Sequence, residues 1–258
     1  MACHQRLLHL AVRVEPVSVP AQDRSASAQP RLVADPSDNT LIARELYRFF
    51  RAGDEETLAL RGVSLAVRRG ETVAVIGPSG SGKSTLLSCL AGLDEPSGGE
   101  VRVNGERISH RPETERARLR ARHIGVLTQS WNLVPHLSVY DNLRLARSAG
   151  PGGRSSLEEV LEQVALERRA HALPRHLSGG ELARAGLAVA LANAPAVLLA
   201  DEPTGELDAS TERRVLDLLR AQAGRGCAVL IVTHSAEAVR VADRVITLND
   251  GRVRDDAT

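Results

Sequence analysis

The sequence has almost no lysine and few aromatic residues, and both shortages limit what the chain can do. Only 2% of its 258 residues are aromatic, which leaves few flat side chains on which the bases of single-stranded nucleic acid could stack. The 33 basic and 32 acidic residues give a formal net charge of +1, so no overall field attracts the chain to nucleic acid or anionic lipid. We therefore expect no nucleic acid among its partners.

Cysteines and long hydrophobic runs are also scarce. The three cysteines, Cys3, Cys89 and Cys227, lie far apart with no Cys-x-x-Cys pair, which favours reduced thiols over a disulfide framework or a zinc site. No uninterrupted apolar stretch approaches the roughly 20 residues that a membrane span needs. The run Leu7–Val12 is too short for a signal peptide, and His9 interrupts it. Any membrane association is therefore expected to come from a partner.

The composition changes near residue 40. Residues 1–40 place four prolines among serine, alanine, glutamine and aspartate without periodicity, which predicts a flexible N-terminal tail. Beyond it, residues 71–76 are predicted to form a buried strand, and the continuous apolar runs at 196–199 and 228–232 are typical of further strands in a parallel sheet buried on both faces. Residues 115–190 have largely helical patterns. We predict one α/β domain over residues 41–258, with a helical subdomain at about 115–190.

The only lysine lies in a glycine-rich loop of the pattern Gly-x-x-x-x-Gly-Lys-Ser, between a predicted strand and a predicted helix. Glycines let backbone N–H groups point inward at phosphates, and the helix adds its positive N-terminal end. A lysine here supplies a compact ammonium for the β- and γ-phosphates. A glycine turn without a ligand is the alternative, but the flanking strand and helix favour nucleoside triphosphate binding. The loop residues are Gly77, Pro78, Ser79, Gly80, Ser81, Gly82, Lys83, Ser84 and Thr85.

Two acidic residues, Asp201 and Glu202, follow the apolar run 196–199. A buried strand that ends in carboxylates places them at the mouth of the sheet, beside the phosphate loop. We expect Asp201 and the Ser84 hydroxyl to hold Mg²⁺, and Glu202 to orient and deprotonate the attacking water. Either acid alone would more often belong to an ordinary loop. Together with the loop, the pair indicates a P-loop NTPase.

The segment Leu177–Glu181 reads Leu-Ser-Gly-Gly-Glu, opens a predicted helix, and places Ser178 23 residues before Asp201. It resembles the Leu-Ser-Gly-Gly-Gln signature of ATP-binding cassette (ABC) ATPases. Taken alone, it could be a glycine turn before a helix. Three further residues strengthen the resemblance, because Gln129, Asp208 and His234 are similar in order and spacing to the Q-loop, D-loop and switch histidine of that family.

The resemblance implies an ABC ATPase fold: a P-loop core of mostly parallel sheet, an antiparallel β portion, and a helical signature subdomain. It implies Mg²⁺-dependent hydrolysis of ATP to ADP and phosphate by two chains arranged head to tail. The second chain would be another copy or a paralogue. The signature of one chain would cap the ATP held by the other, through Ser178, Gly179, Gly180 and Glu181 with Asp208 nearby. The pair would drive an integral-membrane permease and lie on the cytoplasmic face of a bacterial membrane.

The same resemblance implies roles for three other residues. Gln129 would reach Mg²⁺ or the attacking water, and His234 would contact the γ-phosphate. Phe50 would stack on adenine, with Tyr47 as the second candidate and core packing as the alternative. Taken alone, Gln129 would be a polar loop residue and His234 a histidine satisfied within its loop.

The segment 201–208 narrows the resemblance to the lipoprotein-release, macrolide-export and division-associated group of bacterial ABC ATPases. Three positions depart from the usual pattern: Glu181 replaces a glutamine, Thr128 a phenylalanine and Val189 an arginine. None of them removes an expected phosphate or metal contact. The alternative function is a regulatory or mechanotransmitting ABC ATPase, which uses ATP binding as a switch, turns over slowly and does not move a solute; the intact Glu202 argues against it. Nucleic-acid-linked ABC proteins fit poorly, because those carry paired cassettes, coiled coils or zinc modules.

Overall fold

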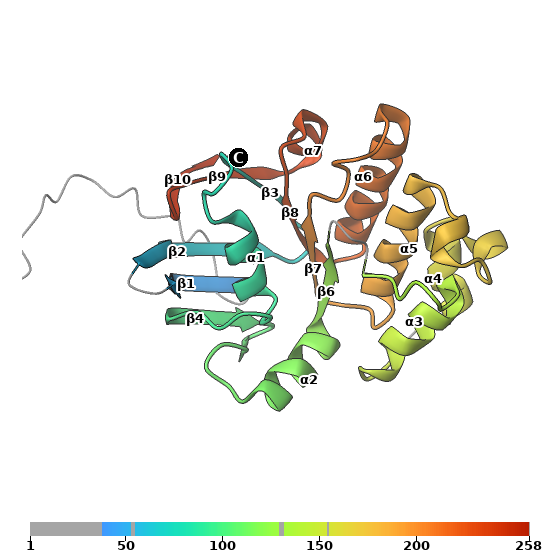
Figure 1. The fold of residues 1–258 in the computed structure, drawn as a ribbon, viewed down its shortest axis with the longest axis horizontal. Helices are drawn as coiled ribbons and strands as arrows, with labels where there is room; N and C mark the ends of the chain where they lie inside the picture. Colours follow the sequence, from blue (N-terminus) through green and yellow to red (C-terminus); the bar gives the residue numbers. More distant parts are fainter. Residues whose placement is uncertain (1–37, 53–54, 129–131, 154, 258) are drawn as a thin grey trace, which may run out of the picture.

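The computed structural model describes residues 38–52, 55–128, 132–153 and 155–257, arranged as two sheets and a layer of helices (Figure 1). The strands are β1 (Asn39–Ala52), β2 (Glu55–Arg68), β3 (Thr72–Ile76), β4 (Gly98–Val103), β5 (Glu106–Arg107), β6 (Ile124–Leu127), β7 (Val197–Asp201), β8 (Ala228–Val232), β9 (Arg244–Asn249) and β10 (Arg252–Ala257). The helices are α1 (Lys83–Leu90), α2 (Glu113–His123), α3 (Val139–Ser148), α4 (Leu157–Gln163), α5 (Gly179–Leu191), α6 (Ala209–Gly224) and α7 (Ala236–Val241), with short 3₁₀ turns η2 (Glu167–Arg169) and η3 (Pro174–His176).

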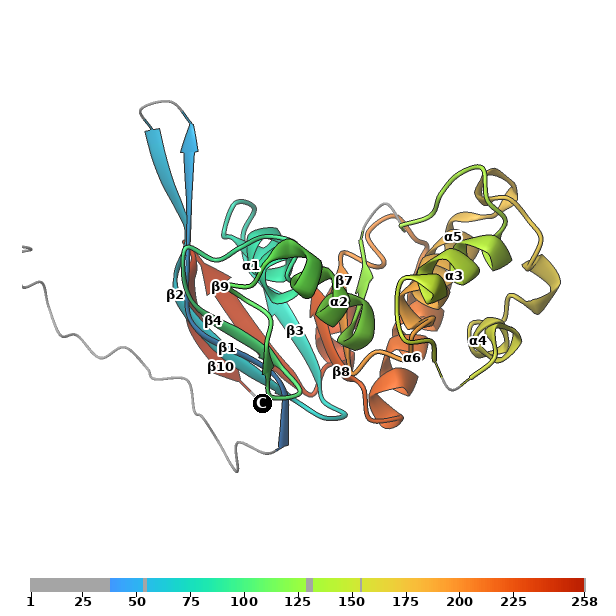
Figure 2. The same cartoon turned by 90° about the horizontal axis from the view of Figure 1, so that it is seen from below.

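The central sheet has six strands in the order β10-β9-β3-β8-β7-β6. All neighbours in it are parallel except the β9–β10 pair. A second, antiparallel sheet has the order β2-β1-β4-β5, and its β1–β2 hairpin extends beyond the body of the molecule (Figure 2). This confirms the predicted fold class, and the runs at 71–76, 196–199 and 228–232 correspond to β3, β7 and β8.

Both faces of the strands β3, β7 and β8 are buried, which explains why these strands are mostly apolar without alternation. Val73 and Leu199 belong to a core shared with α1 and the antiparallel sheet. Leu198 and Val229 belong to a second core, shared with the helices α3 to α6. Since successive strand residues point to opposite faces, the residues on both faces of such a strand are mostly apolar.

The segment expected to be largely helical, 115–190, contains one strand of the central sheet. β6 pairs in parallel with β7 from Ile124–Val197 to Leu127–Ala200. Its four residues lie between the helix α2 and a loop, so they are too few to interrupt a helical pattern visibly. At the other boundary, Asn39 and Thr40 already belong to β1, whereas residues 1–37 of the predicted tail lie outside the described residues.

Side-chain caps fix where several helices begin. The N-cap residues of α3, α4, α5, α6 and α7 each accept a hydrogen bond from a backbone N–H in the first turn of the helix. They are Ser138, Ser156, Ser178, Asp208 and Ser235. In the part of the chain that the structure describes, no helix combines the length and the apolar character needed to cross a membrane.

Candidate nucleotide-binding site

The glycine loop connects β3 to α1 and requires glycine at two positions. Gly77 has φ +154°, and a Cβ there would lie 2.0 Å from the carbonyl oxygen of Leu248. Gly82 has φ +99°, and a Cβ there would lie 2.5 Å from the carbonyl oxygen of Ala59. The loop is therefore held against β9 and β2 at distances that any side chain would disrupt.

Lys83 is the first residue of α1, and its side chain folds back over the loop. Its ammonium donates to the carbonyl oxygens of Gly77 at 2.8 Å and Pro78 at 2.9 Å. The residue is only 7% exposed. An ammonium has three donors, so a third remains for a phosphate oxygen. The compact head group of lysine matches these three directions around one nitrogen, whereas a planar guanidinium does not.

The turn between β9 and β10 supports the loop from the far end of the sequence. The backbone N–H of Gly251 donates to the carbonyl of Ser81 at 3.0 Å, and Arg61 N–H donates to the carbonyl of Gly251 at 2.8 Å. The β9–β10 turn is thereby fixed to two segments that lie far from it in the sequence, β2 and the phosphate loop.

Asp201 is the last residue of β7 and lies beside the start of α1. The Ser84 hydroxyl donates to its carboxylate, and Lys83 lies close enough to stabilise its charge. Burial is the larger effect and raises the pKa of Asp201 above its ordinary value. The predicted metal ligands Ser84 and Asp201 are therefore in contact, and their oxygens are of the kind that Mg²⁺ prefers. A cation at this place would compensate for the burial of the carboxylate.

Glu202 and His234 meet at the ends of adjacent strands. Glu202 has φ +47°, an uncommon conformation for a residue with a side chain, and its N–H donates to the carbonyl of Val232 at 2.9 Å. The backbone N–H of His234 donates to Glu202 Oε2 at 3.3 Å, and His234 Nε2 lies 3.5 Å from Oε1. The Glu202 carboxylate is thus held at the end of β7 by the loop that follows β8.

These groups line one cavity of about 400 Å³. Nine of the predicted site residues contribute to its wall: Ser79, Gly80, Gly82, Lys83, Ser84, Thr85, Asp201, Glu202 and His234. Gly77 and Pro78 instead line an adjoining open depression, which they share with His234. Ser81 is 3% exposed and faces into the loop, where its hydroxyl has no partner among the described residues.

The cavity also contains residues that the sequence did not indicate. Arg61 forms an ion pair with Asp250 at 3.0 Å, and both side chains lie on the wall together with Thr57. The pairing joins positions 61 and 250, and no local pattern distinguishes either of them. They were missed because only the meeting of β2 with the β9–β10 turn brings them to the site.

Two further residues were predicted to contact the ligand, Phe50 the adenine and Gln129 the Mg²⁺. Phe50 does not line the cavity, but it lies directly across the hairpin from Thr57, which does. Directly opposed residues of an antiparallel pair share a face, so Phe50 and Thr57 lie on the same face of the hairpin. It is 41% exposed, and the guanidinium of Arg48 lies 4.6 Å from the ring centre. Gln129 lies outside the described residues.

The signature residues lie apart from the cavity of their own chain. Ser178 caps α5, and Gly179, Gly180 and Glu181 form the first turn of that helix, which packs near the start of α6. None of the four contributes to the wall of the cavity. Asp208 caps α6, and its carboxylate accepts from the N–H and hydroxyl groups of Ser210 and Thr211. These hydrogen bonds hold the pKa of Asp208 well below its usual range.

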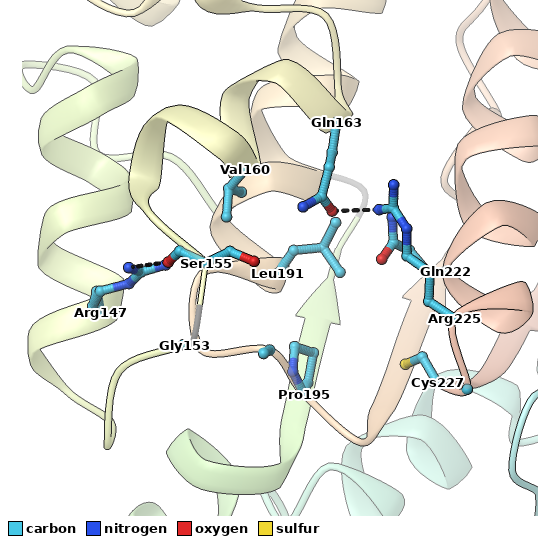
Figure 3. Close-up of a pocket in the computed structure, with 12 residues that line it drawn as sticks. Arg147, Gly153, Ser155, Val160, Gln163, Leu191, Pro195, Gln222, Arg225 and Cys227 are labelled. Atoms are coloured by element: carbon cyan, nitrogen blue, oxygen red, sulfur yellow. Dashed lines mark hydrogen bonds between the residues drawn. The ribbon is translucent and has the colours of Figure 1, made fainter.

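A second cavity, of about 230 Å³, lies at the opposite ends of β7 and β8 (Figure 3). Arg147 enters from one side and Gln222 and Arg225 from the other. Arg147 donates to the carbonyl of Ser155, and Arg225 donates to Gln163. No residue of the phosphate loop lines this cavity, so it is separate from the nucleotide site.

The fold and the site together define a P-loop nucleoside-triphosphate-binding protein of the α/β class. Residues 60–205 match the family model described as ABC transporter. The chain belongs to that family, which confirms the resemblance inferred from its motifs.

Curated relatives and solved structures also belong to the ABC transporter family. The chain is 40% identical over 227 residues to the ABC transporter ATP-binding protein YbbA of Escherichia coli (strain K12), covering 86% of this chain and 100% of that protein. It is 39% identical over 221 residues to the lipoprotein-releasing system ATP-binding protein LolD of Zymomonas mobilis, covering 84% and 95%. It is 35% identical to MJ0796, a bacterial ABC transporter cassette solved as a dimer, with a TM-score of 0.78, covering 84% and 98%.

Proposed function

We propose that this chain is the ATP-hydrolysing subunit of a bacterial ABC transporter complex, which dimerises head to tail around two ATP molecules and drives a separate membrane permease. One observation carries the proposal: Lys83, Asp201 and Glu202 line one cavity, whereas the signature at Ser178 lies outside it. A signature outside its own chain's cavity can contact only a nucleotide held by another chain. The dimeric MJ0796 cassette supports this arrangement.

The phosphate loop binds the triphosphate mainly through charge and position. The backbone N–H groups of the loop and the N-terminus of α1 face the phosphate oxygens. Lys83 contributes its third donor and a full positive charge beside the γ-phosphate. These groups are fixed before ATP arrives, so they neutralise charge in the transition state without reorganising. Phe50 is proposed to contact the adenine from the hairpin.

Glu202 is proposed as the general base. As the oxygen of the attacking water bonds to the γ-phosphorus, a proton passes from that water to a carboxylate oxygen of Glu202, and the β,γ-bridging oxygen leaves with ADP. The N–H of His234 holds Glu202 Oε2 in place while its imidazole lies beside Oε1. His234 is therefore positioned to contact the γ-phosphate next to the base.

Ser84 and Asp201 are proposed to hold Mg²⁺, with Gln129 as a further ligand. Mg²⁺ in such a site neutralises the charge that develops on the β- and γ-phosphates. Asp201 is well suited to this role because burial already disfavours its unpaired negative charge. The Ser84 hydroxyl, which donates to Asp201 here, can turn its lone pairs toward a cation.

The permease is proposed because of the relatives and not from a surface of this chain. LolD is the ATP-binding protein of a lipoprotein-releasing system, and this chain covers 95% of it. We propose that this chain likewise lies on the cytoplasmic face of the membrane through its permease. Closure and reopening of the dimer would then drive the permease, with the segment from Gln129 to Pro135 proposed as the link.

Replacing Glu202 with glutamine tests the proposal. Glu202→Gln removes the base and keeps the shape, so ATP binding should remain while hydrolysis falls by about 10²- to 10⁴-fold. The ATP-loaded variant should persist as a dimer in light scattering. Glu162→Gln makes the same chemical change on the exposed side of α4, away from the cavity, and should hydrolyse ATP at the parental rate.

Two results would contradict the proposal. A Glu202→Gln chain that stays monomeric at saturating ATP would refute the head-to-tail dimer. A parental chain without ATPase activity, both alone and with membranes that contain its permease, would refute the transport-coupled ATPase and favour a regulatory switch.

A further inference from the structure

The first turn of α5 contains a negative charge where an anion is proposed to bind. Glu181 and Ser178 form a reciprocal cap: Glu181 Oε2 accepts from Ser178 N–H at 2.9 Å, and Ser178 Oγ accepts from Glu181 N–H at 3.3 Å. The bond from Ser178 is the main reason that the pKa of Glu181 is lowered. The carboxylate is therefore ionised at neutral pH and fixed beside the signature.

A fixed carboxylate at this helix end opposes the binding of a phosphate. The N-terminus of a helix attracts anions through its free N–H groups and its dipole. The charge of Glu181 reduces that attraction, and its bond to Ser178 occupies one N–H group. The neutral glutamine that ABC ATPases commonly have at this position would not carry the charge.

Arg169 compensates for that charge from outside the helix. It lies in the turn η2, and its Nε donates to Glu181 Oε1 at 2.9 Å. Glu181 is thereby bonded through both oxygens, one to Ser178 and the other to Arg169. The Glu181 side chain is 18% exposed, whereas that of Arg169 is 53% exposed, so the guanidinium forms the outer side of the pair.

We propose that Arg169 is a positioning residue of the composite ATP site, whose guanidinium neutralises Glu181 so that the signature can receive the γ-phosphate held by the opposite chain. The inference depends on the proposed head-to-tail dimer. Each dimer contains two signatures, so the loss of one guanidinium per chain acts twice. Loss of one exposed charge pair should weaken the ATP-bound dimer by a factor of about three, and loss of the pair in both chains should weaken it about tenfold.

The experiment measures dimer dissociation with saturating ATP, by analytical ultracentrifugation, in chains that all carry Glu202→Gln. Arg169→Gln should weaken the dimer about tenfold, and adding Glu181→Gln should restore it, because no charge then needs compensation. Arg169→Lys should keep most of the affinity. Arg168→Gln is the matched control, since it removes the same charge from the neighbouring exposed residue and should leave the dimer as it is.

The binding of ATP to the monomer, measured at low protein concentration, should be equal in all these chains. A doubly substituted chain that remains as weak as Arg169→Gln would overturn the inference, because the loss would then be structural. Equal weakening by Arg168→Gln would also overturn it, since only net charge would then matter. If the parent chain does not dimerise with ATP, the proposed function fails first, and that result is distinct from both.

Discussion

The geometry of Lys83 predicts that arginine cannot replace the one lysine of an arginine-rich chain. Its ammonium donates to Gly77 and Pro78 and has one donor left for phosphate. Lys83→Ala removes a unit charge about 4 Å from the phosphate, worth about 4 kcal/mol at an effective dielectric constant near 20, or about 1,000-fold in affinity. Lys83→Arg keeps the charge but loses a charge-assisted hydrogen bond of about 1.5–3 kcal/mol, or roughly 10- to 150-fold.

Isothermal titration calorimetry with ATP and Mg²⁺ measures both losses, and thermal unfolding without nucleotide shows whether each variant is folded. The expected order of affinity is the parent chain, then Lys83→Arg, then Lys83→Ala. Parental affinity in a folded Lys83→Arg chain would refute the argument from donor geometry. An affinity within threefold of the parent for Lys83→Ala would show that the loop is not the site.

Two further predictions concern stability. Gly82→Ala should lower the free energy of unfolding by about 2–4 kcal/mol, because the new Cβ meets the carbonyl of Ala59. Gly80→Ala should lower it by only about 1–2 kcal/mol, because nothing lies within 4 Å of a Cβ there. Equal losses of unfolding free energy for the two variants in urea denaturation would contradict this prediction. Asp201→Asn should raise the melting temperature of the nucleotide-free chain at pH 7. Burial raises the pKa of Asp201, so the folded state loses stability as the pH rises from the ordinary pKa of an aspartate to the higher pKa in the folded chain. Asparagine has no charge to bury and avoids this loss. A lower melting temperature of Asp201→Asn would contradict the burial argument.

Most of the fold could be predicted from the sequence, because buried parallel strands have continuous apolar runs. The strands β3, β7 and β8 coincide with the predicted runs, and α1 begins at the loop as expected. The strand β6 was missed since its four residues span only about one period of the surrounding helical pattern, too few to show an alternation of their own. The antiparallel pairing of β1 with β4 was not predicted either, because these strands meet across long stretches of sequence and no local pattern specifies the pairing.

For the candidate site, the sequence could predict those residues that lie within short motifs. Lys83, Asp201 and Glu202 line one cavity as their positions after strands predicted. Arg61 and Asp250 were not predictable, because an ion pair between distant positions leaves no trace in either segment. The pairing of Arg169 with Glu181 was missed for the same reason.

The contact between the β9–β10 turn and the phosphate loop has a consequence for how the protein is made. The ribosome releases Gly77–Thr85 before the β9–β10 turn, since the loop precedes that turn in the sequence. The backbone hydrogen bond that supports it comes from Gly251, which follows much later in the chain. Synthesis proceeds at about 5–20 residues per second, so the loop exists for many seconds before its support arrives. A growing chain therefore contains the phosphate-loop motif for some time before the turn that holds the loop in place has been made.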